Sequence, residues 1–538
     1  MLNRRRSAEL LPLVFFSLSV LLCGAEVPAT ALIPLSITQT LVVSEGAKMM
    51  YKPVPFSLVE FDDNFWAPRL RRNREWSIPH VYWQLKEHGQ LEAFRHKTDP
   101  TKKTHIFWDS DLAKWMEGVS YCLMQQRDSE LEATMDEIVS WMADAQLEDG
   151  YLNSHFIAAG VENRWKNLRV EHELYCAGHL IEAAVAYYEA TGKKRFLDII
   201  CRYVDHIDAT FGSDKRRGYP GHEEIELALV KLYRVTGEQK YLHLSQFFLE
   251  ERGQQPHYYN QEALERGEDE QTANSRTHEE LQAHKPIREQ TEVAGHAVRA
   301  MYLYSAMADV AMEMGDDELF HVCEQLWENL TTKYLYITAG IGSTSRHEGF
   351  TVPYDLPNEN AYSETCASLG LVFWNHRMLQ RDCDSRYADL MEQALYNSAL
   401  SGVSLGGRLF FYTNPLASRG DRSRQPWFGC SCCPTNIVRF IASVGQYFYS
   451  HNADQIAVHL YANGTASIPM GSQTVQLTQQ TKYPWDGKVT LTLGLDAPAE
   501  FTLKLRIPGW CKKASLRTAG KTISIQDCLQ KGYVCMTR

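Results

Sequence analysis

The sequence has 538 residues, of which 44% are hydrophobic, 11% aromatic and 22% charged. This composition is typical of folded globular proteins and excludes the disordered, collagen-like and membrane-embedded classes. Lys and Arg number 55 against 66 Asp and Glu, a formal net charge of −11. Because a duplex-binding protein needs a basic face, we expect no nucleic-acid partner.

The first 25 residues have the pattern of an export signal. Arg4–Arg6 are followed by an apolar stretch from Leu10 to Leu22 that is too short to cross a bilayer, and Ala25 is a small residue at a cleavage position. We predict a signal peptide at residues 1–25, a leader segment at 26–58, and an exported chain, periplasmic or secreted, with no stable membrane span. An uncleaved membrane anchor and a lipid anchor on Cys23 stay open as alternatives.

Residues 59–450 are predicted to form a helical domain. Apolar residues recur at helical spacing, and Gly192, Gly237 and Gly315 are expected to cap three helices where similar connections lead into the next helix. The first two connections lie roughly 45 residues apart, a period typical of stacked helical pairs. An open solenoid and a closed ring both suit this pattern. An (α/α)6 barrel of six inner and six outer helices fits the length.

The pattern changes after Tyr449. Strand-like runs separated by turn residues follow at 456–461, 465–468, 475–478, 489–493 and 501–507. This alternation predicts an antiparallel β-sandwich over residues 451–538. The predicted fold class is therefore mainly α with a β C-terminal part. Because the strand pattern continues to the last residue, we expect the β-sandwich to be small or incomplete.

A cysteine-rich cluster lies late in the helical domain. Glu364, Cys366, Cys432 and Cys433 offer one carboxylate oxygen and three sulfurs, a set that favours zinc over magnesium or calcium. Pro434 suits the start of a helix, so the paired cysteines should lie at a helix N-terminus, where the helix dipole favours thiolates. The spacing matches no standard zinc finger, so buried thiols and a disulfide remain alternatives.

Three histidines occupy comparable places near the starts of helices in successive pairs: His172, His222 and His296. In a ring of helical pairs such positions face one rim, so a ligand-facing role is as well supported as a structural one. His179 lies two turns along the same helix as His172, and we expect it to be structural.

Several segments, in family order, resemble glycoside hydrolase family 127, whose founding activity is β-L-arabinofuranosidase. They are residues 172–179, 288–292, 354–358, 361–367 and 427–434. The likeness runs from about Val59 to the end of the chain. It implies an (α/α)6 barrel followed by β-sandwich domains and a glycan or oligosaccharide substrate. Family members usually carry more C-terminal β-structure than residues 451–538 supply.

The resemblance also implies roles for individual residues. It implies zinc held by Glu364, Cys366, Cys432 and Cys433, with Cys432 as the nucleophile. Glu348, in the loop before the Glu-Thr-Cys element, would be the acid/base, and His172, His222 and His296 would contact the sugar. A retaining reaction would then pass through a thioglycosyl intermediate on Cys432. Because Glu348 must begin protonated, we expect its pKa to be raised.

Two other functions stay open from the residues alone. A barrel of this kind can bind glycans around a structural zinc site. It can also host another carbohydrate-active reaction that relies on carboxylates, tyrosine or histidine. The sequence leaves the oligomeric state open, a homodimer included.

Overall fold

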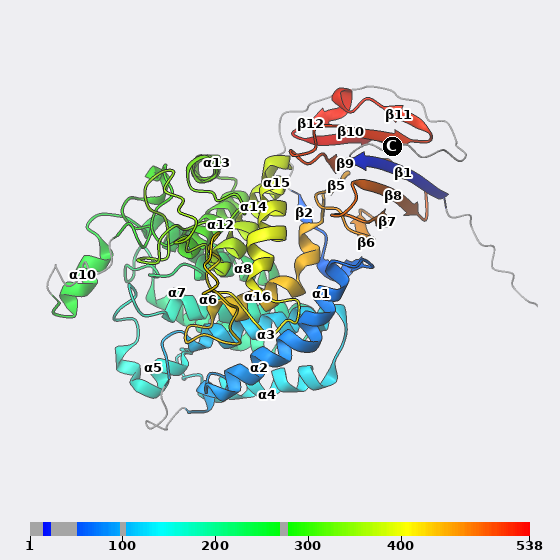
Figure 1. Ribbon diagram of the computed structural model, residues 1–538. Helices are drawn as coiled ribbons and strands as arrows, with labels where there is room; N and C mark the ends of the chain where they lie inside the picture. The colour runs from blue at the N-terminus through cyan, green and yellow to red at the C-terminus, as the bar shows by residue number, and fades with distance from the viewer. Residues whose placement is uncertain (1–13, 23–50, 97–103, 269–277, 538) are drawn as a thin grey trace, which may run out of the picture. The chain divides into compact units, whose positions relative to one another are not determined.

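The computed structural model of the protein describes residues 14–22, 51–96, 104–268 and 278–537. These residues fall into two compact units (Figure 1). A helical unit comprises residues 69–378 and 390–443, and a β-rich unit comprises the described residues up to Pro68, residues 379–389 and the chain from Val444 onward.

The helices occupy the middle of the chain. Their bounds are α1 Trp66–Arg72, α2 Ile78–Glu87, α3 Trp108–Gln125, α4 Ser129–Ala145, α5 Ser154–Ala159, α6 Glu173–Thr191, α7 Arg195–Thr210, α8 Ile225–Thr236, α9 Gln239–Glu251, α10 Tyr258–Glu265, α12 Ala297–Met314, α13 Asp317–Lys333, α14 Thr365–Asp382, α15 Ser385–Ala394 and α16 Cys432–Ala442. None of the helices in the described part of the chain is long and apolar enough to cross a membrane.

Six of the described helices, α3, α6, α8, α12, α14 and α16, are buried over most of their length. Helices α2, α4, α7, α9, α13 and α15 alternate buried and exposed residues, as outer helices do. Consecutive inner helices pack together, and the ring closes where Phe373 of α14 meets Phe440 of α16, with ring centroids 5.9 Å apart. A Cβ on Gly118 of α3 would lie 3.3 Å from the Arg439 backbone of α16. The arrangement is the predicted barrel of inner and outer helices.

The connections between inner and outer helices follow the sequence pattern. Gly192, Gly237 and Gly315 end α6, α8 and α12 with φ of 74°, 77° and 67°. This left-handed conformation is unfavourable for residues with a Cβ, so glycine ends the inner helix and the outer helix begins within a few residues. The three predicted caps are confirmed.

The β-rich unit contains two sheets. The strands are β1 Val14–Leu22, β2 Lys52–Pro53, β3 Val59–Phe61, β4 Tyr449–His451, β5 Gln455–Val458, β6 Gly464–Met470, β7 Gln473–Thr481, β8 Lys488–Leu495, β9 Thr502–Arg506, β10 Ala514–Thr518, β11 Lys521–Ile523, β12 Leu529–Gln530 and β13 Tyr533–Thr537. One sheet has the order β11-β10-β1-β8-β7-β6-β3 and the other β12-β13-β9-β5-β4-β2. The amide of Gln479 in the first sheet donates to the Tyr449 hydroxyl in the second at 2.5 Å, so the sheets pack as a sandwich.

The sandwich differs from the prediction in two respects. Strands β5 and β9 pair in parallel, whereas the sequence predicts only antiparallel neighbours. Strand β2 falls in the predicted leader segment and β3 begins the predicted barrel, yet both extend the sheets, β2 beside β4 and β3 beside β6. Strands of two or three residues are too short to show a periodicity, so the sequence pattern could not reveal them.

Residues 14–22 form strand β1, which pairs antiparallel with both β8 and β10. The sequence predicts the same stretch as the apolar part of a signal peptide. Short apolar runs with β-branched and aromatic residues suit both structures, because hydrophobicity alone does not distinguish them. Arg4–Arg6, Cys23 and residues 26–50 of the predicted leader lie outside the described residues.

Candidate active site

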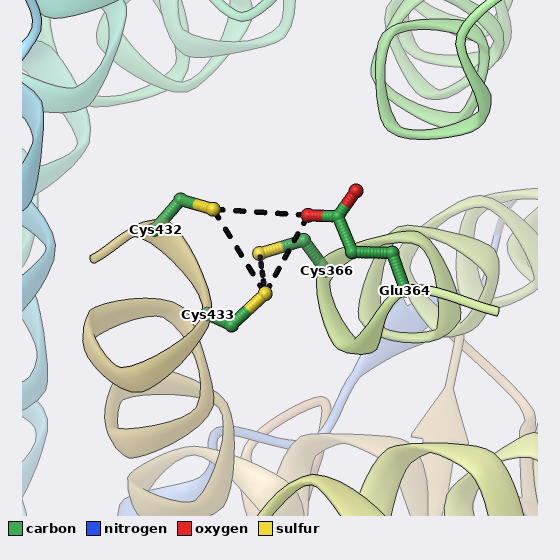
Figure 2. Close-up of side chains that lie close together, drawn as sticks. All are labelled: Glu364, Cys366, Cys432 and Cys433. Carbon is green, nitrogen blue, oxygen red and sulfur yellow. Dashed lines mark hydrogen bonds between the residues drawn. The ribbon is translucent and has the colours of Figure 1, made fainter. Parts of the chain in front are cut away.

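Glu364 and the three predicted ligand cysteines converge at the starts of two inner helices (Figure 2). Glu364 immediately precedes α14, Cys366 is the second residue of α14, and Cys432 and Cys433 are the first two residues of α16. The Sγ atoms of Cys432 and Cys433 lie 3.7 Å and 3.5 Å from Glu364 Oε1, and Cys366 Sγ lies 3.3 Å from Cys433 Sγ. All four candidate ligand atoms lie within 4.8 Å of one another.

Local hydrogen bonds fix the two helix starts. The Thr365 amide donates to the carbonyl of Tyr412 at 2.9 Å, and its hydroxyl donates to the carbonyl of Phe411 at 2.8 Å. At the start of α16 the Ser431 hydroxyl donates to Asp111 of α3 at 2.7 Å. The cysteines at both helix starts are therefore held by buried polar contacts.

The cluster fits a tetrahedral metal ion. Metal–sulfur bonds of about 2.3 Å place two sulfur ligands about 3.8 Å apart, and Cys432 and Cys433 Sγ are 3.8 Å apart. Glu364 Oε2 is buried without a hydrogen-bond partner. Burial and the neighbouring Cys432 raise the pKa of Glu364, whereas for Cys366 the hydrogen bonds from Cys432 and Cys433 outweigh burial and lower the pKa to about 6. Four acidic groups so crowded are readily stabilised by a divalent cation.

Glu348 lies beside this cluster. Its Oε2 is 2.9 Å from His296 Nε2, and Glu348, His296 and Glu364 bring one ligand atom each within 4.8 Å of the others. Burial raises the pKa of Glu348, but the His296 hydrogen bond and the charges of His296 and Arg299 together hold it below the usual value. The sequence-based expectation of a raised pKa is therefore wrong for this arrangement, because the sequence does not show that a histidine donates to the carboxylate.

The backbone around Glu348 is tightly constrained. Glu348 has φ of 54°, in the left-handed region. The Ala297 amide donates to the Glu348 carbonyl at 3.1 Å, and Phe350 donates to the Gly295 carbonyl at 2.9 Å. A Cβ on Gly349 would lie 1.7 Å from the Gly295 carbonyl oxygen, so only glycine fits between them.

The three predicted sugar-contacting histidines lie in a row. The His222 ring centroid is 5.9 Å from that of His172 and 5.7 Å from that of His296. Tyr175 packs against His222 with centroids 4.2 Å apart. His172 and His222 are partly exposed, whereas His296 is 8% exposed and begins α12 as its N-cap. Three residues that are distant in the sequence thus present imidazoles to one small region.

His179 is buried below this row. Its side chain is inaccessible to solvent, and Nδ1 lies 2.9 Å from Glu224 Oε1. Burial lowers the pKa of His179 well below its usual value and raises that of Glu224. His179, Glu182 and Glu224 each bring one potential ligand atom within 4.8 Å of the others, so the structural role that the sequence predicts for His179 stays a prediction.

Sequence reasoning missed Tyr412. Its hydroxyl lies 3.3 Å from Cys432 Sγ and 3.8 Å from Cys430 Sγ. Tyr412 belongs to an irregular segment with no motif or periodicity, so nothing in the sequence distinguishes it from other tyrosines. Cys430 is also close, with Sγ 3.7 Å from Cys432 Sγ, although it is not one of the four grouped ligands.

The chain matches known proteins over most of its length. Residues 58–446 match the family model described as the β-L-arabinofuranosidase GH127 catalytic domain, and residues 455–538 match the GH127 middle domain. The non-reducing end β-L-arabinofuranosidase of Bifidobacterium longum subsp. longum is 38% identical over 453 residues, which are 80% of this chain and 68% of the relative.

Solved structures agree with this assignment. The crystal structure of a GH127 β-L-arabinofuranosidase from Geobacillus stearothermophilus T6 matches with a TM-score of 0.87 and 46% identity, covering 89% of this chain and 79% of that chain. A second structure, of a GH127 β-arabinofuranosidase, matches with a TM-score of 0.83 and 38% identity over 91% of this chain and 79% of that one. This chain therefore belongs to the GH127 β-L-arabinofuranosidase family of glycoside hydrolases.

Proposed function

We propose that this hydrolase releases β-L-arabinofuranose from the non-reducing end of glycans, with retention of configuration and Cys432 as the nucleophile. One observation carries the proposal: Glu364 Oε1 and three cysteine sulfurs lie within 4.8 Å of one another, beside the Glu348–His296 pair. The names of the similar enzymes support the choice of sugar.

Zinc is the metal that the ligand set favours. One carboxylate oxygen and three sulfurs form a soft set of four ligands, which suits zinc and does not suit magnesium or calcium. Glu364, Cys366, Cys432 and Cys433 would hold the ion. When bound, zinc keeps the sulfur of Cys432 in its thiolate form and stabilises it again as a leaving group.

The chain's own residues account for the two chemical steps. In the first step Cys432 Sγ attacks the anomeric carbon while Glu348 protonates the departing glycosidic oxygen, which leaves a thioglycosyl bond to Cys432. In the second step Glu348 takes a proton from water, the water oxygen attacks the anomeric carbon, and the carbon–sulfur bond breaks. The first step starts from the protonated form of Glu348, and the 2.9 Å hydrogen bond between Glu348 Oε2 and His296 Nε2 orients the carboxyl group.

The row of histidines suits a neutral sugar. His172 and His222 can each donate or accept a hydrogen bond to a ring hydroxyl, and the Tyr175 ring packs against both. His296 lies next to His222, and its two ring nitrogens bond Glu348 and the Val298 amide. Lys114 is buried beside this row and donates to the Tyr175 hydroxyl at 2.8 Å, so its ammonium group is already engaged by the protein. The hydroxyl-rich pentose matches this set of groups.

Export is a separate proposal that rests on the sequence. Arg4–Arg6 and the apolar run that follows have the order of a signal peptide. The same run forms β1 between β8 and β10, so cleavage near Ala25 would remove one strand from that sheet. The mass and N-terminal sequence of the protein recovered from its native compartment test this: an N-terminus near residue 26 supports export, and an intact Met1 contradicts it.

The reaction is tested with an aryl β-L-arabinofuranoside and three variants. Cys432→Ala and Glu348→Gln should each lower kcat by more than about 10³-fold, since each removes a group that acts in both steps. Cys430→Ala is the matched control, because its sulfur lies beside Cys432 but outside the four grouped ligands, and it should stay within a few-fold of the parent.

Two further readouts separate the alternatives. Proton NMR of the first-formed sugar should show the β-anomer, and mass spectrometry after rapid acid quench should find a pentosyl group on Cys432. Full activity in Cys432→Ala would exclude the thiolate mechanism and favour carboxylate chemistry. Glycan binding without turnover in the parent would favour a binding protein with a structural metal site.

A further inference from the structure

Arg252, the residue directly after the end of α9, lies in an unusual position for an arginine. Its side chain is fully buried, and the guanidinium lies over the Tyr219 ring, 4.9 Å from the ring centroid. The described contacts join it to two chain segments on either side, residues 220–226 and residues 281–285. Each of these segments leads to one of the three histidines in the site.

The first segment carries His222. Arg252 NH1 lies 2.9 Å from Glu223 Oε1, and NH2 lies 3.2 Å from Glu226 Oε1. NH2 also donates to the Pro220 carbonyl at 2.8 Å. These three contacts surround His222, whose Nδ1 lies 2.9 Å from the Glu223 carbonyl oxygen. The guanidinium group therefore holds the turn that presents this imidazole, together with the Gly221 amide bond to Leu168 and the Tyr259 hydroxyl bond to Pro220.

The second segment is connected to His296. Arg252 NH1 donates to the Leu281 carbonyl at 2.8 Å. The next residue, Gln282, is fully buried with φ of 51°, and its amide donates to the carbonyls of Ala294 at 2.8 Å and His296 at 3.2 Å. The position of Leu281 therefore determines where Gln282 can hold the backbone of His296.

Arginine suits this junction because its planar head presents donors in several fixed directions. The guanidinium group donates to three acceptors on two segments and forms an ion pair with Glu223, whereas a lysine ammonium has one nitrogen and cannot reach both sides at once. The neighbouring glycine is equally constrained: a Cβ on Gly253 would lie 2.1 Å from the Lys285 carbonyl oxygen. The local backbone therefore leaves little room for the segments to readjust.

We propose that Arg252 is a positioning residue for sugar recognition, which sets the spacing of His222 and His296 without touching the substrate. The inference rests on the proposed function, in which both histidines contact the arabinofuranose ring. Arg252 acts through the two segments that it joins. Because a displacement of about 1 Å in a binding group lowers turnover by up to roughly 10²-fold, loss of this junction is expected to be visible in the kinetics.

The test compares Arg252→Lys with a substitution at another arginine of the same unit. Arg377, whose side chain is 12% exposed, pairs through Nε with buried Asp309 at 2.5 Å, away from the histidine segments. Arg252→Lys should raise KM for the aryl β-L-arabinofuranoside by about 10-fold or more and lower kcat/KM by about 10- to 100-fold. Arg377→Lys should change KM less than about 3-fold.

A double mutant separates positioning from general destabilisation. If Arg252 acts through His222, adding Arg252→Lys to His222→Ala should raise KM much less than it does in the parent, because the group that it positions is gone. If Arg252→Lys acted only by disturbing the structure, it would raise KM by the same factor in the parent and in His222→Ala. If Arg252→Lys does not fold, Glu223→Gln removes the same ion pair with an isosteric side chain and should raise KM in the same direction.

The outcomes are distinct. A parental KM in Arg252→Lys, or a full additional effect in the His222→Ala background, overturns the inference. A parental KM in His222→Ala itself shows that His222 does not contact the sugar, which overturns that part of the proposed function and the inference with it. A raised KM that disappears in the double mutant supports both.

Discussion

Replacing Arg439 by methionine probes the buried charges at the centre of the helical unit. Arg439 of α16 is 3% exposed, and NH1 lies 2.5 Å from Glu117 of α3 and 2.6 Å from Glu182 of α6. Lys231 of α8 lies 3.8 Å from Glu117 and also contacts Glu182. The two carboxyl groups thus face two cations, and the substitution leaves Lys231 as the one cation of this pair beside both of them.

The expected loss of stability follows from this balance. Breaking a buried ion pair by removing one partner costs about 3–5 kcal/mol. Because Lys231 stays in place, we expect a loss of that size and not twice as much. Methionine has a similar length, so little of the loss should come from a cavity. By comparison, Arg217→Met breaks a pair that is one third exposed on the arginine side and should cost at most about 1 kcal/mol.

The pH dependence identifies the cause. Burial raises the pKa of Glu182, but Lys231 and Arg439 outweigh it and hold the pKa well below its usual value, so this group stabilises the folded parent above about pH 4.5. Without Arg439 the pKa of Glu182 in the folded state rises. A carboxyl group with a raised pKa in the folded state lowers the stability of the protein as the pH increases. The loss caused by Arg439→Met should therefore be larger at pH 8 than at pH 5.

Urea unfolding at both pH values measures this loss, with Arg217→Met as the control. A loss of stability below about 1 kcal/mol would contradict this reasoning, because it would mean that the two carboxyl groups do not need the second cation. A loss that is the same at pH 5 and pH 8 would show that packing, and not an unpaired carboxylate, is responsible.

Three other predictions concern the site and its surroundings. Cys366→Ser should lower bound zinc from about one equivalent per chain to below about 0.1 after dialysis against a chelator, whereas Cys430→Ser should keep its zinc. Equal zinc content in the two variants would refute the ligand assignment. Gly349→Ala forces a clash with the Gly295 carbonyl and should lower kcat/KM by about 10- to 100-fold, and parental kinetics would show that the Glu348 loop tolerates movement. Burial raises the pKa of Glu173 to about 8, so the parent loses stability as the pH rises toward 8. In urea titrations, Glu173→Gln should lose less stability than the parent, by up to about 1.4 kcal/mol per pH unit. The same dependence of unfolding free energy on pH in both proteins would refute this.

The features that the sequence predicts correctly are local ones. Gly192 and its two counterparts mark helix ends because left-handed backbone is a single-residue property. Strands β6 to β8 coincide with predicted alternating segments, since one buried face imposes a period of two, whereas most residues of β5 and β9 are buried. The grouping of Glu364 with three cysteines could be predicted because few chemistries use those residue types together.

The features that the sequence does not show depend on contacts between distant segments. The lowered pKa of Glu348 comes from His296, which a loop and a helix start bring together. Tyr412 and Arg252 carry no pattern of their own, and their importance is visible only from what surrounds them. The parallel pairing of β5 with β9 is likewise a matter of topology, which strand periodicity does not determine.

The pairing of β3 with β6 has a consequence for biosynthesis. Val59 faces Ala466, so β3 is synthesised about 400 residues before the strand with which it pairs. The barrel helices emerge in between and can begin to associate. Termination of synthesis between β3 and β6 therefore leaves the edge of β3 unpaired on the nascent chain.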